Sequence, residues 1–458
     1  MVSVLVLHNV KPSEKERYMK VKKAMLVPEY YREHIQPRLP WLLNNADGRP
    51  FLFYSKRGIL QSGYSLKQAF HRVNYQNCSC VKALPNPWIT EFLHKGLGFG
   101  TDCSSTSELL LSRAVGVPGT DTMYSSNRTT RDQYEVAMRD GGCIINFDDI
   151  TAMDRVPGKF PEVVCFRINP GKRRTGNAII GNPYDAKYGI TYNQIIPAYH
   201  GAMKRGAGVF GIHMMVCSNE KRSPYFVETI REILLVAAML KRKLGIEVSI
   251  VDIGGGFGIP YKAGDRILNL EWIGERGSKL LNDFGNEYGF MPKLITECGR
   301  FVTGPHGFLV NPVVSVEQKY RHFVGVEAGM LGCPRPAFYG SYHYTEVYSP
   351  SGELRTGPCH FTNIADSLCE NWGRLTPVDR PRWLPKSIRP GDIMVTFNCG
   401  AHSGAMASNY NGWPRLAEYL DQDGTNENVI KIRRAERDED LFRTVTRSGR
   451  FTLPGQGV

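Results

Sequence analysis

One short stretch of this 458-residue chain places a reactive amine beside apolar residues. Residues 80–88 read Cys-Val-Lys-Ala-Leu-Pro-Asn-Pro-Trp, so Lys82 ends a strand-like segment just before two prolines. A partly desolvated lysine has a lowered pKa and can form a Schiff base with a carbonyl compound. A lysine that lays its stem along apolar surface, with its ammonium group in water, gives the same pattern. Position alone favours this second interpretation.

Two further segments end in residues that could hold a heterocycle or an anion. His213 closes the apolar run Val209–Ile212, and Ser218 follows five residues later. Glu297 and Arg300 lie in the string Thr-Glu-Cys-Gly-Arg, which also contains Gly299. The glutamate could hold a heterocycle nitrogen and the arginine an anion. A hydrogen-bonded core histidine and a simple Glu–Arg pair remain the alternatives.

A run of glycines follows the strand-like segment Val248–Asp252. Gly254, Gly255 and Gly256 are consecutive, so backbone N–H groups there could approach a phosphate closely. The G-x-G-x-x-G spacing of a dinucleotide site is lacking. A flexible turn is an equally good interpretation.

The last third of the chain adds an arginine and a cysteine. Arg335 stands between two prolines in Pro-Arg-Pro-Ala-Phe-Tyr, and this backbone could aim its guanidinium at a carboxylate. A surface arginine in a stiff loop is the alternative. Cys369 is followed by Glu370, and a lone cysteine is more often inert packing than catalytic.

Strand-like and helical patterns alternate between residues 50 and 310, and they predict the elements that must position these groups. Eight strand-like runs are separated by helical stretches such as Tyr225–Leu244, which is the count of a (β/α)₈ barrel. An open doubly wound sheet gives the same alternation. The eight runs are Ser79–Val81, Gly98–Asp102, Met123–Ser125, Cys143–Asn146, Val163–Ile168, Gly208–His213, Val248–Ile253 and Lys293–Thr296.

The pattern after residue 312 is mostly β, with runs such as Asp392–Asn398 between turn residues. The first 45 residues fit neither pattern, and residues 37–41 read as a connector. We therefore predict an α/β protein with two domains. A TIM-type barrel spans residues 48–312, and residues 1–47 and 313–458 form a β-rich second domain.

Composition limits the classes of partner and compartment. The net charge is +13, but the basic residues are scattered, without zinc-finger spacing or an aromatic RNA-binding signature. A solvated basic surface is the better interpretation, and we expect no nucleic acid and no metal. Eleven cysteines without paired spacing favour a reducing compartment, so we expect a cytoplasmic protein. No run approaches 18 apolar residues, so no membrane span is expected.

Taken together and in order, these strings resemble the fold-type III pyridoxal-phosphate decarboxylases, the ornithine/diaminopimelate/arginine decarboxylase group. The resemblance covers roughly residues 50–420. It is closest to the diaminopimelate decarboxylases and the related D-lysine/D-ornithine branch. Seven segments carry it: Cys80–Pro87, Gly211–Ser218, Asp252–Pro260, Glu297–Arg300, Arg335–Tyr339, Cys369-Glu370 and Met406–Glu418. Each is weak alone, and their shared order is the signal.

The resemblance implies a cofactor, pyridoxal 5′-phosphate, and a role for each residue. Lys82 would bind the cofactor covalently, His213 would pack on its ring and Glu297 would hold the ring nitrogen protonated. Cys369 would come from the partner subunit of a homodimer and return a proton to the α-carbon. The phosphate would be surrounded by Gly254, Gly255, Gly256, Ser218 and Tyr410, with Gly299 and Arg300 also at the cofactor. The substrate would be held by Arg300, Arg335, Tyr339, Glu370 and Tyr410.

Two departures from the family pattern concern the cysteine. The usual C-E-S-x-D reads Cys-Glu-Asn-Trp-Gly here, so the final acid is missing. Gly357-Pro358-Cys359 also mimics the usual G-P-x-C, but Cys359 is followed by His360. We prefer Cys369 because Glu370 completes the pair.

The resemblance implies decarboxylation of a diamino acid at a D-configured α-carbon, and meso-diaminopimelate to L-lysine is our first hypothesis. The alternative is a D-lysine/D-ornithine decarboxylase that yields cadaverine or putrescine. Only diaminopimelate carries a second carboxylate for Arg335. L-Ornithine decarboxylation fits less well. A remote alternative is an inactive regulatory relative, which the presence of Lys82, Glu297 and Cys369 argues against.

Overall fold

A barrel of parallel strands forms the first half of the molecule. The computed structural model describes residues 26–176, 181–377 and 379–444, and in them strands β2 to β9 close into a barrel in chain order, with β9 paired to β2. The prediction of a barrel rather than an open sheet is therefore confirmed, and each predicted run overlaps one strand. The strands are β2 Tyr75–Cys80, β3 Gly100–Cys103, β4 Thr122–Tyr124, β5 Ile144–Phe147, β6 Val163–Arg167, β7 Val209–His213, β8 Ile250–Asp252 and β9 Lys293–Thr296.

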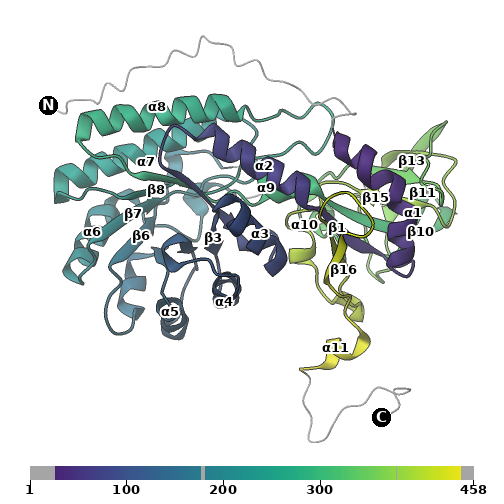
Figure 1. Cartoon of the computed structure of the whole chain (residues 1–458), viewed down its shortest axis with the longest axis horizontal. Coiled ribbons are helices and arrows are strands. Elements are labelled where there is room, and N and C mark those ends of the chain that lie inside the picture. Colours follow the sequence, from purple (N-terminus) through teal and green to yellow (C-terminus); the bar gives the residue numbers. More distant parts are fainter. Residues whose placement is uncertain (1–25, 177–180, 378, 445–458) are drawn as a thin grey trace, which may run out of the picture.

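Helices cover the outside of the barrel (Figure 1). In α7 the first turn contains Pro224, which needs no N–H partner there, and Gly245 ends the helix with a φ of 72°. Between β5 and β6 the connection is only a 3-10 turn, Ile150–Arg155. The helices of this half are α2 Lys56–Ala69, α3 Pro87–Leu97, α4 Thr106–Ala114, α5 Arg131–Met138, α6 Ile195–Lys204, α7 Ser223–Leu244, α8 Leu270–Tyr288 and α9 Arg300–Thr303.

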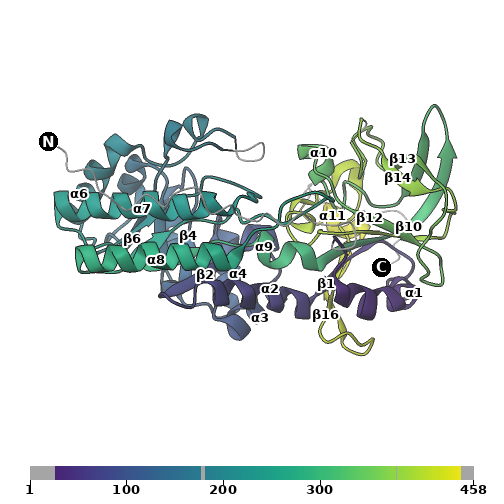
Figure 2. The same ribbon diagram turned by 90° about the horizontal axis from the view of Figure 1, so that it is seen from above.

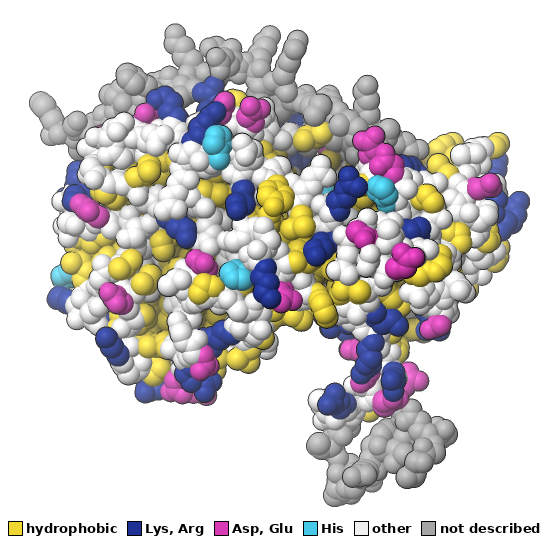
Figure 3. All heavy atoms as spheres, viewed as in Figure 1, with side chains coloured by type: hydrophobic (Ala, Val, Ile, Leu, Met, Phe, Trp, Pro, Cys, Tyr) yellow, Lys and Arg dark blue, Asp and Glu magenta, His cyan; other side chains and the backbone are white. Residues whose placement is uncertain are grey.

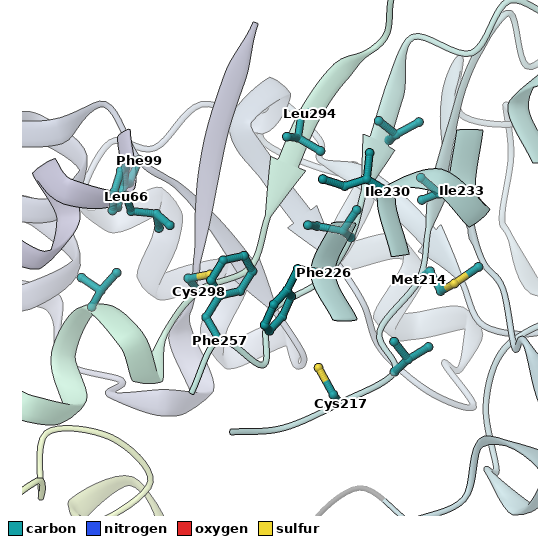
Figure 4. Packing of buried hydrophobic residues seen from close by; sticks show 14 of the residues in the cluster. Leu66, Phe99, Met214, Cys217, Phe226, Ile230, Ile233, Phe257, Leu294 and Cys298 are labelled. Atoms are coloured by element: carbon teal, nitrogen blue, oxygen red, sulfur yellow. The ribbon is translucent and has the colours of Figure 1, made fainter. Parts of the chain in front are cut away.

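The barrel has two apolar cores, a small one in its lumen and a large one between the strands and the surrounding helices. A small cluster combines buried side chains from six different strands, which can meet only in the lumen: Cys78, Met123, Ile144, Cys165, Ile250 and Ile295. The large core fills the space between strands and helices. Figure 4 shows part of it, where Phe226 of α7 faces Phe257, with ring centroids 4.0 Å apart. The lumen is thus packed, and chemistry is left to the strand ends.

The second half is mostly β, as predicted (Figure 2). Its sheet contains β1, which pairs antiparallel with β10 and parallel with β16. The long strand β10 continues outward to pair with β11 and β15. The strands are β1 Phe51–Ser55, β10 Gly307–Gln318, β11 His322–Val326, β12 Thr345–Tyr348, β13 Cys359–Ala365, β14 Arg382–Pro385, β15 Ile393–Thr396, β16 Ala417–Asp421 and β17 Val429–Arg433, and the helices are α10 Arg335–Tyr339 and α11 Asp438–Phe442.

The segment before β1 is helical, so the prediction of a connector at residues 37–41 is wrong. A 3-10 turn, Gln36–Arg38, leads into α1, Leu39–Asn45. Leu39 and Leu42 of this helix are buried in the core of the second sheet, together with Tyr31. Proline is tolerated in a first helical turn, which is where Pro40 lies.

The predicted domain limits at residues 48 and 312 stay a prediction, and the sheet pairing bears on them. Strand β1 lies after residue 48 but belongs to the second sheet, and β10 begins at Gly307, before residue 312. The barrel is thus inserted between two strands that pair with each other. Hydrogen bonds between β1 and β10 close the insertion at its base.

The charges visible in Figure 3 are mixed: Lys and Arg side chains are scattered among acidic ones over the face shown. Among the described residues, helices that combine the length and the apolarity needed to cross a bilayer are absent.

A buried histidine joins three separate segments at the base of the insertion. His306 follows α9, its Nδ1 lies 2.9 Å from the Tyr30 hydroxyl and its Nε2 lies 2.7 Å from Ser62 Oγ on α2. Burial lowers the pKa of His306 from 6.5 to about 3. The imidazole is therefore neutral in the folded protein, and it connects the N-terminal segment to both halves.

This histidine predicts an acid-dependent loss of stability. Below pH 6.5 the unfolded chain protonates His306 while the folded chain does not, so the stability present above pH 6.5 is lost as the pH falls toward 3. Between pH 6 and pH 4 the loss from this group is about 2–3 kcal/mol, at about 1.4 kcal/mol per pH unit. Urea unfolding of wild type and His306→Gln at both pH values checks it. Between pH 6 and pH 4, the free energy of unfolding should decrease by about 2–3 kcal/mol less in the variant than in wild type. An equal decrease in both proteins would refute the assignment.

Candidate active site

Lys82 lies at the carboxyl end of the barrel, in a 3-10 turn rather than in a strand. Strand β2 ends at Cys80, and the turn Val81–Ala83 carries the lysine beyond it. The next helix, α3, starts at Pro87 behind the cap Asn86, whose side chain accepts a hydrogen bond from the Trp88 amide. The two prolines noted in the sequence thus belong to a loop and a helix start, and the lysine side chain is 43% exposed.

The nearest partner of Lys82 is a buried carboxylate at the end of β3. Lys82 Nζ donates to Asp102 Oδ2 at 2.5 Å, and the Cys80 thiol lies 3.1 Å from the same oxygen. Desolvation lowers the pKa of Lys82, but Asp102 outweighs it, so the pKa is raised well above its usual value. The expectation of a lowered pKa is therefore wrong for this structure, because the sequence did not reveal the carboxylate opposite the amine.

Three more titratable groups meet at the ends of β7, β8 and β9. His213 Nε2 lies 3.3 Å from Glu297 Oε2, and both residues are buried. Burial raises the pKa of Glu297, but the charge of His213 and the hydrogen bond to it outweigh burial and lower it. Burial and the neighbouring Glu297 raise the pKa of Asp252, whose Oδ1 accepts the Gly254 amide at 2.8 Å. These surroundings therefore favour the ionised form of Glu297 and the protonated form of Asp252.

The glycine run is a tight loop beside these groups. Gly254 and Gly256 have φ values of 67° and 87°, which other residues adopt only with strain. A Cβ on Gly255 would lie 2.4 Å from the Glu297 carbonyl oxygen, and one on Gly256 would lie 2.5 Å from that of Cys217. Backbone packing alone thus requires these glycines. Gly299 serves a similar purpose, since a Cβ there would meet Ala83 and Cys80 beside Lys82.

Two buried guanidinium groups lie next to this loop without acidic partners. Arg300 Nη1 donates to the Tyr261 hydroxyl at 2.8 Å and its Nη2 lies 3.5 Å from Ser218 Oγ. The guanidinium of Arg335 lies over the ring of Tyr261, 4.8 Å from its centroid. Neither arginine forms an ion pair with any of the described residues. The structure therefore brings Ser218, Arg300 and Arg335 together.

Cys369, Glu370 and Tyr410 form a separate group nearer the surface. The Tyr410 hydroxyl donates to Glu370 Oε2 at 3.2 Å, and the Cys369 amide donates to Asn411 Oδ1 at 3.0 Å. Tyr339, at the end of α10, is half-exposed. Within the described ranges, no hydrogen bond or ion pair links the Cys369–Tyr410 group to Lys82. In a single chain, then, the predicted site is in two parts.

The rival cysteine lies elsewhere. Cys359 begins β13 and pairs with Pro385 of β14, and its thiol donates to the Gly357 carbonyl at 3.4 Å. It has no contact with Glu370 or Tyr410. The geometry thus groups Cys369, rather than Cys359, with the other predicted substrate residues.

Comparison with known proteins agrees with this arrangement. The pyridoxal-binding domain of the pyridoxal-dependent decarboxylases matches residues 58–304, more than half of the chain. The chain belongs to this family. The decarboxylase is 36% identical over 418 residues to "Protein TabA" of Pseudomonas amygdali pv. tabaci, with 91% of this chain and 95% of the relative covered. It is 32% identical over 405 residues to the diaminopimelate decarboxylase of Thermoplasma acidophilum, with 87% and 93% covered.

Solved structures show the same fold. Diaminopimelate decarboxylase of M. jannaschii in complex with L-lysine superposes with a TM-score of 0.80 at 26% identity, and covers 89% of this chain and 94% of its own. The protein is accordingly a pyridoxal-phosphate-dependent decarboxylase. The predicted family, fold and cofactor are confirmed, while the individual residue roles stay predictions.

The residues present at the barrel mouth fit the cofactor. Glu297 Oε1 and His213 Nδ1 are buried and have no hydrogen-bond partner among the described residues. A protonated pyridine nitrogen would give Glu297 the donor that it lacks, and Lys82 supplies the amine. The fit rests on these open hydrogen-bonding positions beside an ionised carboxylate.

Sequence reasoning missed four residues of this site. Asp102, Asp252 and Tyr261 lie within or beside quoted strings, but no role was assigned to them. His402 was also missed. Its amide donates to the Ala83 carbonyl at 2.8 Å, and burial together with the charges of Arg300, Arg335 and Lys82 lowers its pKa well below the usual value. The signal for Asp102 was its position at a strand end, where barrel enzymes carry chemistry. Nothing in the sequence pointed to His402.

Proposed function

We propose that the decarboxylase acts on the D-configured centre of meso-diaminopimelate and releases L-lysine and CO₂. The observation that carries this proposal is the pair of buried guanidinium groups, Arg300 and Arg335, without carboxylate partners. Buried cations need compensation, and a substrate carboxylate would supply it. D-Lysine has one carboxylate, at the reacting centre, and no second one to offer. The similarity to diaminopimelate decarboxylases of T. acidophilum and M. jannaschii supports the same choice.

Each residue's task follows from its place in the site. When bound, pyridoxal phosphate supplies an electron-withdrawing ring that delocalises the charge left on the α-carbon by loss of CO₂. Glu297, held ionised by His213, would keep the proton on the ring nitrogen. Lys82 would hold the cofactor's carbonyl carbon, and Asp102 would orient the amine. The phosphate would lie at Ser218, Tyr410 and the glycine loop.

The carbanion must receive one proton on one face, and a positioned acid is needed for this. We assign that task to Cys369, with Glu370 holding the distal ammonium group. Because Cys369 is exposed in the single chain and no hydrogen bond or ion pair joins it to Lys82 among the described residues, we propose a homodimer in which Cys369 of the partner subunit completes each site. All eleven cysteines are free thiols, which supports a cytoplasmic protein.

CO₂ release from meso-diaminopimelate, D-lysine, D-ornithine and L-ornithine tests the substrate. We expect diaminopimelate to be turned over with the highest kcat/KM. Inert diaminopimelate with active D-lysine would show that the enzyme belongs to the alternative class.

The variant Arg335→Ala sharpens this test. The variant removes the charge-assisted partner of a buried carboxylate, which should cost about 2–5 kcal/mol of transition-state stabilisation. The kcat/KM for diaminopimelate should therefore fall roughly 30- to 5,000-fold. Arg382→Ala is a matched control, because Arg382 is also buried and lies over a tyrosine ring, that of Tyr342, at 3.8 Å. The control should keep its kcat/KM. An equal loss in both variants would point to destabilisation rather than to substrate binding.

A further inference from the structure

Arg335 is held by a neutral ring rather than by an acid. His343 precedes β12, is buried, and its Nε2 lies 3.0 Å from Arg335 Nη1. A guanidinium has only donors, so Nε2 must be the acceptor of this hydrogen bond. The proton of the imidazole is then on Nδ1, which lies 2.9 Å from the carbonyl oxygen of Phe397 and donates to it. The contacts thus define one neutral tautomer.

Two strands fix the orientation of this imidazole. Phe397 directly follows β15, and its amide donates to the Tyr344 carbonyl at 2.9 Å. That bond extends the antiparallel pairing of β12 with β15 to the residue that accepts from His343. The acceptor lone pair is therefore directed at Arg335 by backbone rather than by a mobile side chain.

Tyr261 separates the two guanidinium groups. Its ring meets that of His343 edge-on, with centroids 5.0 Å apart and planes at 68°, and it lies under Arg335. Its hydroxyl accepts from Arg300. Arg300, Tyr261, His343 and Arg335 therefore form one buried chain in which each cation is held by a neutral group.

We propose that His343 is a positioning residue that fixes Arg335 for the distal carboxylate of the substrate, as a neutral acceptor that leaves the positive charge of Arg335 uncompensated. An aspartate or glutamate in its place would orient the guanidinium equally well. It would also neutralise the guanidinium and repel the incoming carboxylate. The inference rests on the proposed function and adds the group that makes the site selective for a ligand with that carboxylate.

The remaining neighbours of the imidazole are thiols. Cys333 Sγ lies 3.6 Å from Nε2, and Cys399 Sγ lies 3.8 Å from Nδ1. Both are buried, so they surround the ring without offering Arg335 a carboxylate. This packing favours substitutions that keep the size and polarity of the histidine.

A comparison of two ligands isolates the contribution of the distal carboxylate to binding. L-Lysine, the proposed product, carries that carboxylate, and cadaverine is the same chain without it. The experiment measures how tightly each ligand inhibits the holoenzyme. Wild type should bind L-lysine at least about 30-fold more tightly than cadaverine.

The variants His343→Asn and His343→Gln distinguish the two hydrogen bonds of the ring. An asparagine amide reaches the Phe397 carbonyl but ends short of Arg335, whereas a glutamine oxygen can reach the position of Nε2. The preference for L-lysine is the ratio of its affinity to that of cadaverine. In His343→Asn we expect this ratio to fall about 10- to 100-fold, the effect of losing a hydrogen bond to a charged group. Its kcat and its cofactor absorbance should stay near wild type. His343→Gln should retain most of the preference.

A second buried histidine provides the control. His306→Asn removes a buried imidazole that contacts hydroxyl groups and no arginine, so it should leave the L-lysine preference unchanged. If His343→Asn does not fold, His343→Leu replaces it. An unchanged preference in the folded variant overturns the role of His343 and leaves the proposed function intact. Equal binding of L-lysine and cadaverine by wild type overturns the proposed function itself.

Discussion

Replacement of Lys82 by alanine should lower turnover by roughly 10³- to 10⁴-fold, the upper range for loss of a group that takes part directly in the chemistry. The reason is that the amine lies just beyond the end of β2 at the barrel mouth, 2.5 Å from a buried carboxylate, where it can bond to the cofactor. The variant should also lose the visible absorbance of covalently bound cofactor. Absorbance scans of protein reconstituted with pyridoxal phosphate, followed by CO₂ assays, provide the measurement.

Lys293→Ala is the matched control for this experiment. Lys293 begins β9, at the opposite end of the barrel, where its ammonium group donates to Gln76 Oε1 at 2.6 Å. This variant should keep both the absorbance and the activity. Unchanged absorbance in Lys82→Ala would show that another amine holds the cofactor.

Because Asp102 is the partner of Lys82, the rate at which the enzyme captures its cofactor should depend on pH. Only a neutral amine can attack a carbonyl carbon, and Asp102 raises the pKa of Lys82. Cofactor capture by the cofactor-free enzyme should therefore become faster as the pH rises. In Asp102→Asn, which keeps the shape of the side chain and removes its charge, the rate profile should shift to lower pH. Superimposable profiles for the two proteins would exclude this role of Asp102.

Much of the barrel could be predicted because each strand is a local apolar run. The eight runs and their helical crossovers depend on short-range pattern, and each run overlaps its strand, with the largest difference at β2, which begins four residues before the predicted run. The pairing of β1 with β10 and β16 was not predictable in the same way. It joins residues some 250 and 360 positions apart, and strand partners at such separation leave no local signal.

The same distinction holds for the site. Lys82, His213 and Glu297 could be found because each lies at or just beyond the carboxyl end of a strand, and these ends meet at one mouth of a barrel. The pKa shifts of these groups could not be predicted from the sequence. The raised pKa of Lys82 comes from Asp102, twenty residues away, and the division of charge between Glu297 and Asp252 comes from contacts across the lumen. His343 received no role from the sequence, because nothing local shows that its imidazole is buried against Arg335.

The prediction for Cys369 tests the part of the site that the single chain leaves incomplete. Cys369→Ala should bind the cofactor with unchanged absorbance and lose roughly 10²- to 10⁴-fold in kcat, the range for removal of a positioned proton donor. Cys359→Ala is the matched control and should be fully active, because the Cys359 thiol donates to the Gly357 carbonyl and its backbone pairs with β14, away from Glu370. If the losses are reversed between the two variants, the assignment of the proton donor is wrong.

The proposed location of Cys369 in a partner subunit makes a further result decisive. A Lys82→Ala chain and a Cys369→Ala chain are each inactive, but a mixed dimer would combine an intact Lys82 with an intact Cys369 in one of its two sites. Random mixing of the two chains should therefore recover about a quarter of wild-type activity. Sites built from one chain would recover none. Cys369 and Tyr410 are exposed in the single chain, Tyr410 bonds to the half-buried Glu370, and no hydrogen bond or ion pair joins the three described residues to Lys82, so we expect recovery.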